Sequence, residues 1–155
     1  MDELELEFVE FVLDTRLQSD CIKMGDFPLC RLLLMNDAQY PWFILVPRRA
    51  EVSEIYHLSS DDQLQLMNEI SCLTENLADL FQARKMNVAA LGNVVNQLHV
   101  HCIVRYEHDS AWPGPVWGVK PAVAYTPEKE QEIRRKLEVL LDGELDYVPE
   151  GDQEG

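Results

Sequence analysis

The sequence predicts an α+β domain with a mainly antiparallel sheet and a long covering helix. Two short apolar runs, at residues 29–35 and 42–46, are joined by a short polar stretch, which is typical of adjacent strands in a hairpin. A long amphipathic pattern occupies residues 60–84. A second group of strands and a last helix follow it. This order of strands, covering helix, strands and helix is what indicates the α+β class.

The first expected element is an amphipathic helix at residues 4–12, because apolar residues recur there at helical spacing and the other face is acidic. Those apolar residues are Leu4, Phe8, Phe11 and Val12. The pattern lapses after Asp14, and Gly25-Asp26 indicates a turn before the first strand.

The long helix has a clear start signal. Ser60 with Gln63 three residues later forms a capping box, and acidic residues at the first turn suit the helix dipole. The spacing of the apolar residues predicts that one helix face is buried. They are Leu66, Ile70, Leu73, Leu77 and Leu80. After this helix we expect a strand at residues 87–91, a turn at 92–96 and a strand at 97–105.

The last part of the chain predicts a loop, a helix and a tail. Residues 108–118 form a rigid but irregular loop, because two prolines fix the backbone. Thr126 caps and Pro127 starts a helix that stops at Gly143. We expect a single domain over residues 1–143 and an acidic, mobile tail over 144–155.

Charge and composition limit the partners. Thirteen basic and 28 acidic residues give a net charge of -15, which opposes binding to nucleic acid or to an anionic membrane. No segment approaches the length of a membrane span, and the acidic N-terminus does not resemble a secretory signal. The four scattered cysteines suit reduced thiols. We therefore expect a cytoplasmic protein.

The strongest functional pattern lies in the strand expected at residues 97–105. Side chains two residues apart share one face of a strand, so Gln97, His99 and His101 project together. Two imidazoles need partners for four ring nitrogens, which makes them a poor choice for core packing. The pattern therefore indicates a site.

This segment resembles the signature of the histidine-triad (HIT) superfamily of nucleotide hydrolases and transferases, in which three histidines alternate with apolar residues. The order of elements is also similar over residues 25–118, including Asn36 after a strand and Pro47 at the end of the next. The resemblance implies a HIT-like fold. Gln97 stands at the first triad position and Trp42 stands where many relatives have histidine, so the chain resembles a bacterial-type Gln-x-His-x-His variant.

The resemblance implies a role for each matched residue. His99 would be the nucleophile that attacks the α-phosphorus of a nucleotide, and His101 would donate a hydrogen bond to a phosphate oxygen. Gln97 would be the third catalytic residue, but its amide cannot titrate, so it would not carry a proton. Asn36 would contact the sugar and Asn93 the phosphate or leaving group. Such a scheme requires no metal or cofactor.

Several residues have two interpretations. Trp112 and Trp117 suit stacking on a base or packing in the core or a dimer interface. The amide of Asn36 suits a turn as well as a ligand. Arg48-Arg49 suits phosphate binding or a solvated sheet edge.

Two other functions remain open from the residues alone. His-x-His on a strand is also a bidentate metal motif, to which Glu107, His108 or Asp109 would add a third zinc ligand. The second of these functions is a non-catalytic nucleotide-binding or protein-interaction module. The resemblance further implies a homodimer formed through the long helix and a strand edge.

Overall fold

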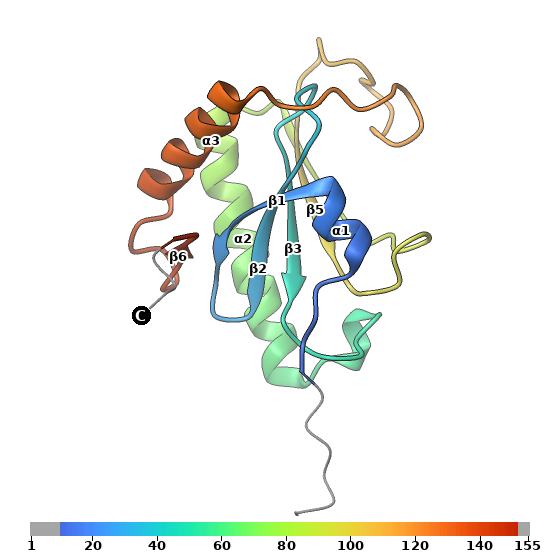
Figure 1. The fold of residues 1–155 in the computed structure, drawn as a ribbon, viewed down its shortest axis with the longest axis vertical. Coiled ribbons are helices and arrows are strands. Elements are labelled where there is room, and N and C mark those ends of the chain that lie inside the picture. Colours follow the sequence, from blue (N-terminus) through green and yellow to red (C-terminus); the bar gives the residue numbers. More distant parts are fainter. Residues whose placement is uncertain (1–9, 152–155) are drawn as a thin grey trace, which may run out of the picture.

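The computed structural model describes residues 10–151. Its elements, shown in Figure 1, follow the chain in an order of helix, three strands, long helix, two strands, helix and short strand. They are α1 (Thr15–Asp20), β1 (Cys21–Asp26), β2 (Cys30–Met35), β3 (Trp42–Pro47), the 3-10 turn η2 (Ile55–His57), α2 (Ser60–Phe81), β4 (Lys85–Ala89), β5 (Val100–Arg105), α3 (Pro127–Leu140) and β6 (Val148–Pro149).

The strands form one sheet in the order β4-β5-β3-β2-β1-β6. Every pairing between the described strands is antiparallel. The α+β class, the antiparallel sheet and the long helix are therefore confirmed. Within residues 10–151, no helix is both long and apolar enough to cross a lipid bilayer.

Both faces of the central strands are covered, which explains why their sequences are apolar throughout. Leu32 and Leu34 join the core beneath α2 and α3, whereas Leu33 and Ile44 join a second core on the opposite face. That second core includes Leu17 of α1. In Figure 1, α1 accordingly lies across the sheet from α2. The histidines belong to the α1 face.

Most of the helix expected at residues 4–12 falls on residues 1–9, which lie outside the described range, and the described residues 10–14 are not helical. A helix that the sequence pattern did not predict, α1, starts at Thr15. Asp14 is its N-cap, and its side chain accepts a hydrogen bond from the backbone N–H of Arg16.

Strand β1 was not expected, and the Gly25-Asp26 turn prediction is wrong. Both residues lie within β1, and the turn follows at residues 27–29. Gly25 is needed there for space, because a Cβ atom would overlap the Tyr147 hydroxyl and lie 2.6 Å from the carbonyl oxygen of Val148. The glycine therefore marks a close approach of another segment.

The other boundaries shift by a few residues. The cap of α2 is Ser59, whose hydroxyl accepts from the backbone N–H of Asp62, so the capping box starting at Ser60 is wrong by one position. This helix ends before the left-handed Gln82, and β4 begins at Lys85. The strand expected at residues 97–105 is β5, which begins only at Val100, so Gln97 and His99 precede it. The Thr126 cap of α3 is confirmed.

The C-terminal segment stays in the fold beyond residue 143. Tyr147 is buried, with its ring centroid 4.9 Å from that of Phe27, and β6 pairs with the end of β1. The expectation of a mobile tail is therefore wrong for residues 144–151, because one aromatic anchor outweighs the acidic composition. Residues 152–155 lie outside the described range.

Candidate functional site

A pocket of about 370 Å³ lies on the α1 face of the sheet, beside the paired histidines. Leu17 of α1, Met35 of β2 and Trp42 of β3 line it, together with residues 91–95 of the turn before the histidines. His99 also lines a smaller adjoining pocket of about 210 Å³. The predicted pair therefore forms part of a concave site rather than a solvated strand face.

The ring of His99 has one nitrogen fixed by the backbone. Its Nδ1 lies 2.7 Å from the carbonyl oxygen of Gln97. A carbonyl oxygen only accepts, so Nδ1 carries the proton and donates it to this bond. In the neutral ring the lone pair is then on Nε2, which is the nitrogen able to attack an electrophile.

His101 has the opposite arrangement. The indole Nε1–H of Trp42 donates a hydrogen bond to Nδ1 of His101, at 3.0 Å. An indole N–H is only a donor, so Nδ1 of His101 is unprotonated and Nε2 carries the proton. Burial, followed by the neighbouring His99, lowers the pKa of His101 to about 3. It is therefore a neutral hydrogen-bond donor at physiological pH.

The two rings thus form a complementary pair. Their centroids are 4.9 Å apart in an edge-to-face arrangement, with one ring offering a lone pair and the other an N–H. Trp42 explains this difference because its indole N–H selects the tautomer of His101. The sequence resemblance alone did not reveal that role.

The depressed pKa of His101 predicts a pH dependence of stability. The unfolded chain binds a proton at this side chain near pH 6.5, whereas the folded chain does so only near pH 3, so stability falls as the pH drops through this window. We expect the free energy of unfolding to decrease by about 2 kcal/mol between pH 7 and pH 5 on this account. Urea denaturation of the wild type and of His101→Gln measures it. Equal pH dependence in the two proteins would contradict the assignment.

Trp117 closes one side of the pocket, next to the histidines. Its ring centroid lies 5.0 Å from that of His101 and 5.8 Å from that of Trp42. The loop that carries Trp117 is fixed to β5 by a buried ion pair, in which Nε of Arg105 lies 2.8 Å from Oδ2 of Asp109. The pocket wall therefore depends on this pair.

Asp109 is held strongly in its charged form. Burial would raise its pKa, but hydrogen bonds from Arg105 and from the backbone N–H groups of Tyr106, Ala111 and Trp112 together lower it to about 2. The guanidinium of Arg105 also lies over the ring of Trp112. Trp112 thus contacts this ion pair and does not line the main pocket, whereas Trp117 does.

The other predicted site residues also differ in whether they line the pocket. Asn93 lines the pocket. Asn36 does not, and its side-chain oxygen accepts a hydrogen bond from the backbone N–H of Tyr125 at 2.9 Å. The amide of Gln97 likewise points away from the histidines, to the backbone of residues 12 and 14.

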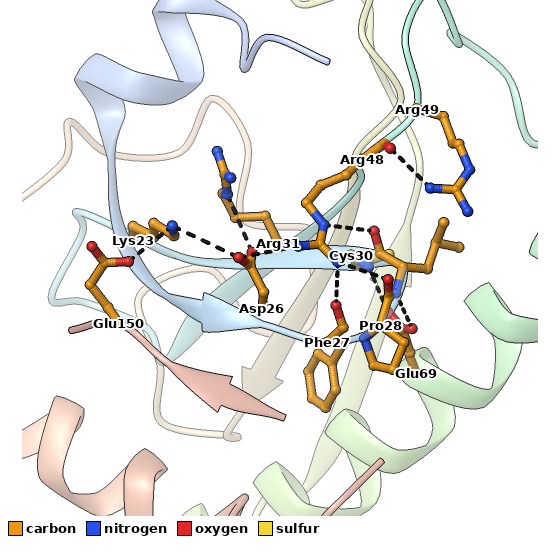
Figure 2. A network of polar contacts seen from close by, with 11 residues as sticks. Lys23, Asp26, Phe27, Pro28, Cys30, Arg31, Arg48, Arg49, Glu69 and Glu150 are labelled. Carbon is orange, nitrogen blue, oxygen red and sulfur yellow. Dashed lines mark hydrogen bonds and ion pairs between the residues drawn. The ribbon is translucent and has the colours of Figure 1, made fainter. Parts of the chain in front are cut away.

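Arg48 and Arg49 lie at a different place, around the turn between β1 and β2 (Figure 2). The guanidinium of Arg48 donates to the carbonyl oxygens of Phe27 and Pro28, each at 2.7 Å, and pairs with Asp26. Arg49 pairs with Asp62. Arg48 therefore stabilises the β1–β2 turn, Arg49 pairs with α2, and neither lines the pocket beside the histidines.

A buried carboxylate completes this region. Glu69 of α2 is fully buried and accepts hydrogen bonds from the backbone N–H groups of Leu29 and Cys30, each at 2.8 Å (Figure 2). These bonds satisfy the backbone N–H groups of Leu29, just before β2, and of Cys30, its first residue. Glu69 thus joins the long helix to the sheet.

The three residues considered as a third zinc ligand make other contacts. Glu107 pairs with Arg84, His108 stacks on Tyr106, and Asp109 is held by Arg105. Among residues 10–151, no group of three potential ligands converges on one point. The four cysteines are free thiols.

The residues that sequence reasoning missed are those of α1 and β2. Arg16, Leu17, Asp20 and Met35 all line the pocket. Asp14 was the one available signal, because it is a good N-cap residue directly before a short helical stretch.

The fold and the paired histidines beside a pocket define the histidine-triad class of proteins. The family model described as "HIT domain" matches residues 16–108, and this chain belongs to that family. A histidine triad protein from Marinobacter aquaeolei VT8 is 51% identical, with a TM-score of 0.85, over 87% of this chain and 98% of that chain. A search of curated proteins returns no match.

Two further solved structures extend the comparison. A histidine triad protein from Bradyrhizobium japonicum is 44% identical, with a TM-score of 0.83, over 84% of this chain and 98% of that chain. A diadenosine triphosphate hydrolase from Plasmodium falciparum shares the fold at 13% identity, with a TM-score of 0.56, over 90% of this chain and 86% of that chain. The family membership and the fold are thereby established.

Proposed function

We propose that this protein is a nucleotide hydrolase or nucleotidyl transferase that cleaves a phosphoanhydride or phosphoramidate bond at the α-phosphate through a covalent intermediate on His99. The observation that carries this proposal is the fixed tautomer of each ring. The Gln97 carbonyl leaves the lone pair of His99 on Nε2, and the Trp42 indole leaves an N–H on Nε2 of His101.

The proposed reaction has two displacement steps. First, the Nε2 lone pair of His99 attacks the α-phosphorus, the new P–N bond forms, and the bond to the leaving group breaks. The leaving group departs with that electron pair and is protonated from solvent. Second, water or another hydroxyl acceptor attacks phosphorus and releases its proton to solvent, the P–N bond breaks, and the electron pair returns to Nε2, which regenerates the neutral ring.

The neighbouring residues have supporting roles in this proposal. His101 donates from Nε2 to a phosphate oxygen as charge grows in the transition state. Asn93, which lines the pocket, contacts the phosphate or the leaving group. We propose that Gln97 occupies the first triad position of a Gln-x-His-x-His variant, where it cannot transfer a proton.

A substrate panel tests this proposal. Adenosine 5′-phosphoramidate and diadenosine triphosphate are incubated with the protein, with and without a metal chelator. We expect AMP to be released from at least one substrate at the same rate in both conditions. Loss of activity on chelation and recovery with zinc would favour metal-dependent hydrolysis. Tight AMP binding without turnover of either substrate would favour a non-catalytic binding module.

We also propose a homodimer, which the family resemblance implies. The strand β4 is an edge of the sheet, with unpaired backbone groups on one side and an exposed Val88. Leu64 and Met67 of α2 are exposed apolar side chains as well. Light scattering measures the mass in solution.

The cytoplasmic location expected from the sequence stays a prediction.

A further inference from the structure

The side chain of Gln97 makes two hydrogen bonds to a distant part of the backbone. Its Oε1 accepts from the N–H of Asp14, and its Nε2–H donates to the carbonyl oxygen of Val12, each at 2.9 Å. More than 80 residues separate these groups in the sequence. Neither bond is directed at His99 or His101. The side chain thus binds the segment that leads into α1.

An amide suits this position for a geometric reason. Its acceptor and donor lie side by side and point in roughly the same direction, so both reach neighbouring backbone groups. The two nitrogens of an imidazole point away from each other, and a carboxylate has no donor. A histidine or glutamate at position 97 would therefore leave one of the two backbone groups without this partner.

The segment held by Gln97 controls the start of α1. Asp14 caps this helix through its side chain, and its carbonyl oxygen accepts from the N–H of Gln18 at 3.0 Å. The helix has only six residues, so it depends on tertiary contacts rather than on its own propensity. Leu13 and Leu17 supply some of these contacts, because both are buried in the core beneath it.

The same short helix forms a wall of the pocket. Arg16, Leu17 and Asp20 all line the space beside His99 and His101. Meanwhile the backbone carbonyl of Gln97 holds Nδ1 of His99. One residue therefore contacts His99 through its backbone and, through its side chain, the segment that leads into this wall of the pocket.

We infer that Gln97 is a positioning residue, whose amide ties α1 to the histidine segment and thereby sets the affinity of the pocket for its nucleotide. It acts through Arg16, Leu17 and Asp20 and has no part in proton transfer. This replaces the catalytic role that the triad resemblance implied for its side chain. The inference deepens the proposed function, on which its reference to a nucleotide rests.

The test compares Gln97→Leu with a matched control, Gln63→Leu. Gln63 also donates its amide to backbone near a helix start, the carbonyl oxygen of Leu58, but it lies outside the pocket. We expect Gln97→Leu to speed hydrogen exchange of the α1 amides by about 10-fold and to weaken AMP binding, measured by calorimetry, by a similar factor. Gln63→Leu leaves both quantities unchanged.

Two further variants identify the route of the effect. Leu17→Ala loosens α1 directly, so it should also weaken AMP binding. In a protein that already carries Leu17→Ala, Gln97→Leu should weaken AMP binding by a smaller factor than it does in the wild-type protein. Gln97→His places an imidazole at the first triad position. We expect Gln97→His to bind AMP as weakly as Gln97→Leu does. We also expect the pH profile of kcat to show no ionisation that is absent from the wild type.

Several outcomes would overturn this inference. The first is unchanged hydrogen exchange of the α1 amides in Gln97→Leu, and the second is wild-type AMP affinity in Gln97→His. The third is a fold-decrease in kcat of Gln97→Leu that exceeds its fold-increase in KM, measured with adenosine 5′-phosphoramidate. Exchange and AMP binding do not depend on turnover. If Gln97→Leu behaves as expected while the wild type cleaves neither substrate, the proposed function fails and the positioning role stands.

Discussion

Replacing His99 by alanine is expected to lower kcat by on the order of 10⁴-fold or more, because the only proposed nucleophile is removed. AMP binding should persist, since most of the pocket wall comes from other elements, including Leu17, Met35 and Asn93. Steady-state kinetics on the cleaved substrate and calorimetry with AMP measure the two effects.

The matched control for this variant is His108→Ala. His108 is exposed, stacks on Tyr106 and does not line the pocket, so its loss should leave kcat within a factor of about two. A His99→Ala protein that stays folded and turns over at the wild-type rate would remove His99 from the chemistry.

Replacing Arg105 by methionine is expected to destabilise the fold by about 3–5 kcal/mol, because it leaves the buried Asp109 without its ionic partner. Both side chains of the pair are almost fully buried, with 2% and 3% exposed. The variant also removes the hydrogen bonds from the guanidinium to Asn87 and to the carbonyl oxygen of Gly114. Urea denaturation measures the loss.

A surface ion pair of the same length provides the control. Arg84 and Glu107 are also 2.8 Å apart, but their side chains are 61% and 65% exposed. We expect Arg84→Met to cost less than about 1 kcal/mol. Similar losses in the two variants would show that burial of the Arg105 pair does not matter. The pair would then not be what fixes the loop that carries Trp117.

Much of the fold could be predicted because patterns of burial are local. The apolar runs at residues 29–35 and 42–46 and the long amphipathic pattern after residue 60 each correspond to a real element. The segments that were missed depend on contacts between distant residues. Strand β1 contains a glycine that looks like a turn until Tyr147 packs against it.

The site shows the same difference between local patterns and contacts between distant residues. His99 and His101 could be identified because their alternation is a local pattern and the rings do lie together. The role of Trp42 could not be, since it depends on pairing β3 with β5, which places Ile44 opposite His101 and the indole beside that ring. The pocket wall from α1 was missed because its helix is short and is stabilised from position 97.

The most direct test of the account is to look for the covalent intermediate. The protein is mixed with the substrate that it cleaves, quenched in alkali within one turnover because P–N bonds hydrolyse in acid, and analysed by peptide mass spectrometry. We expect a nucleotidyl group on His99 in the wild type and none in His99→Ala. Rapid product formation with no modified histidine, or with the group on another residue, would contradict the proposed mechanism.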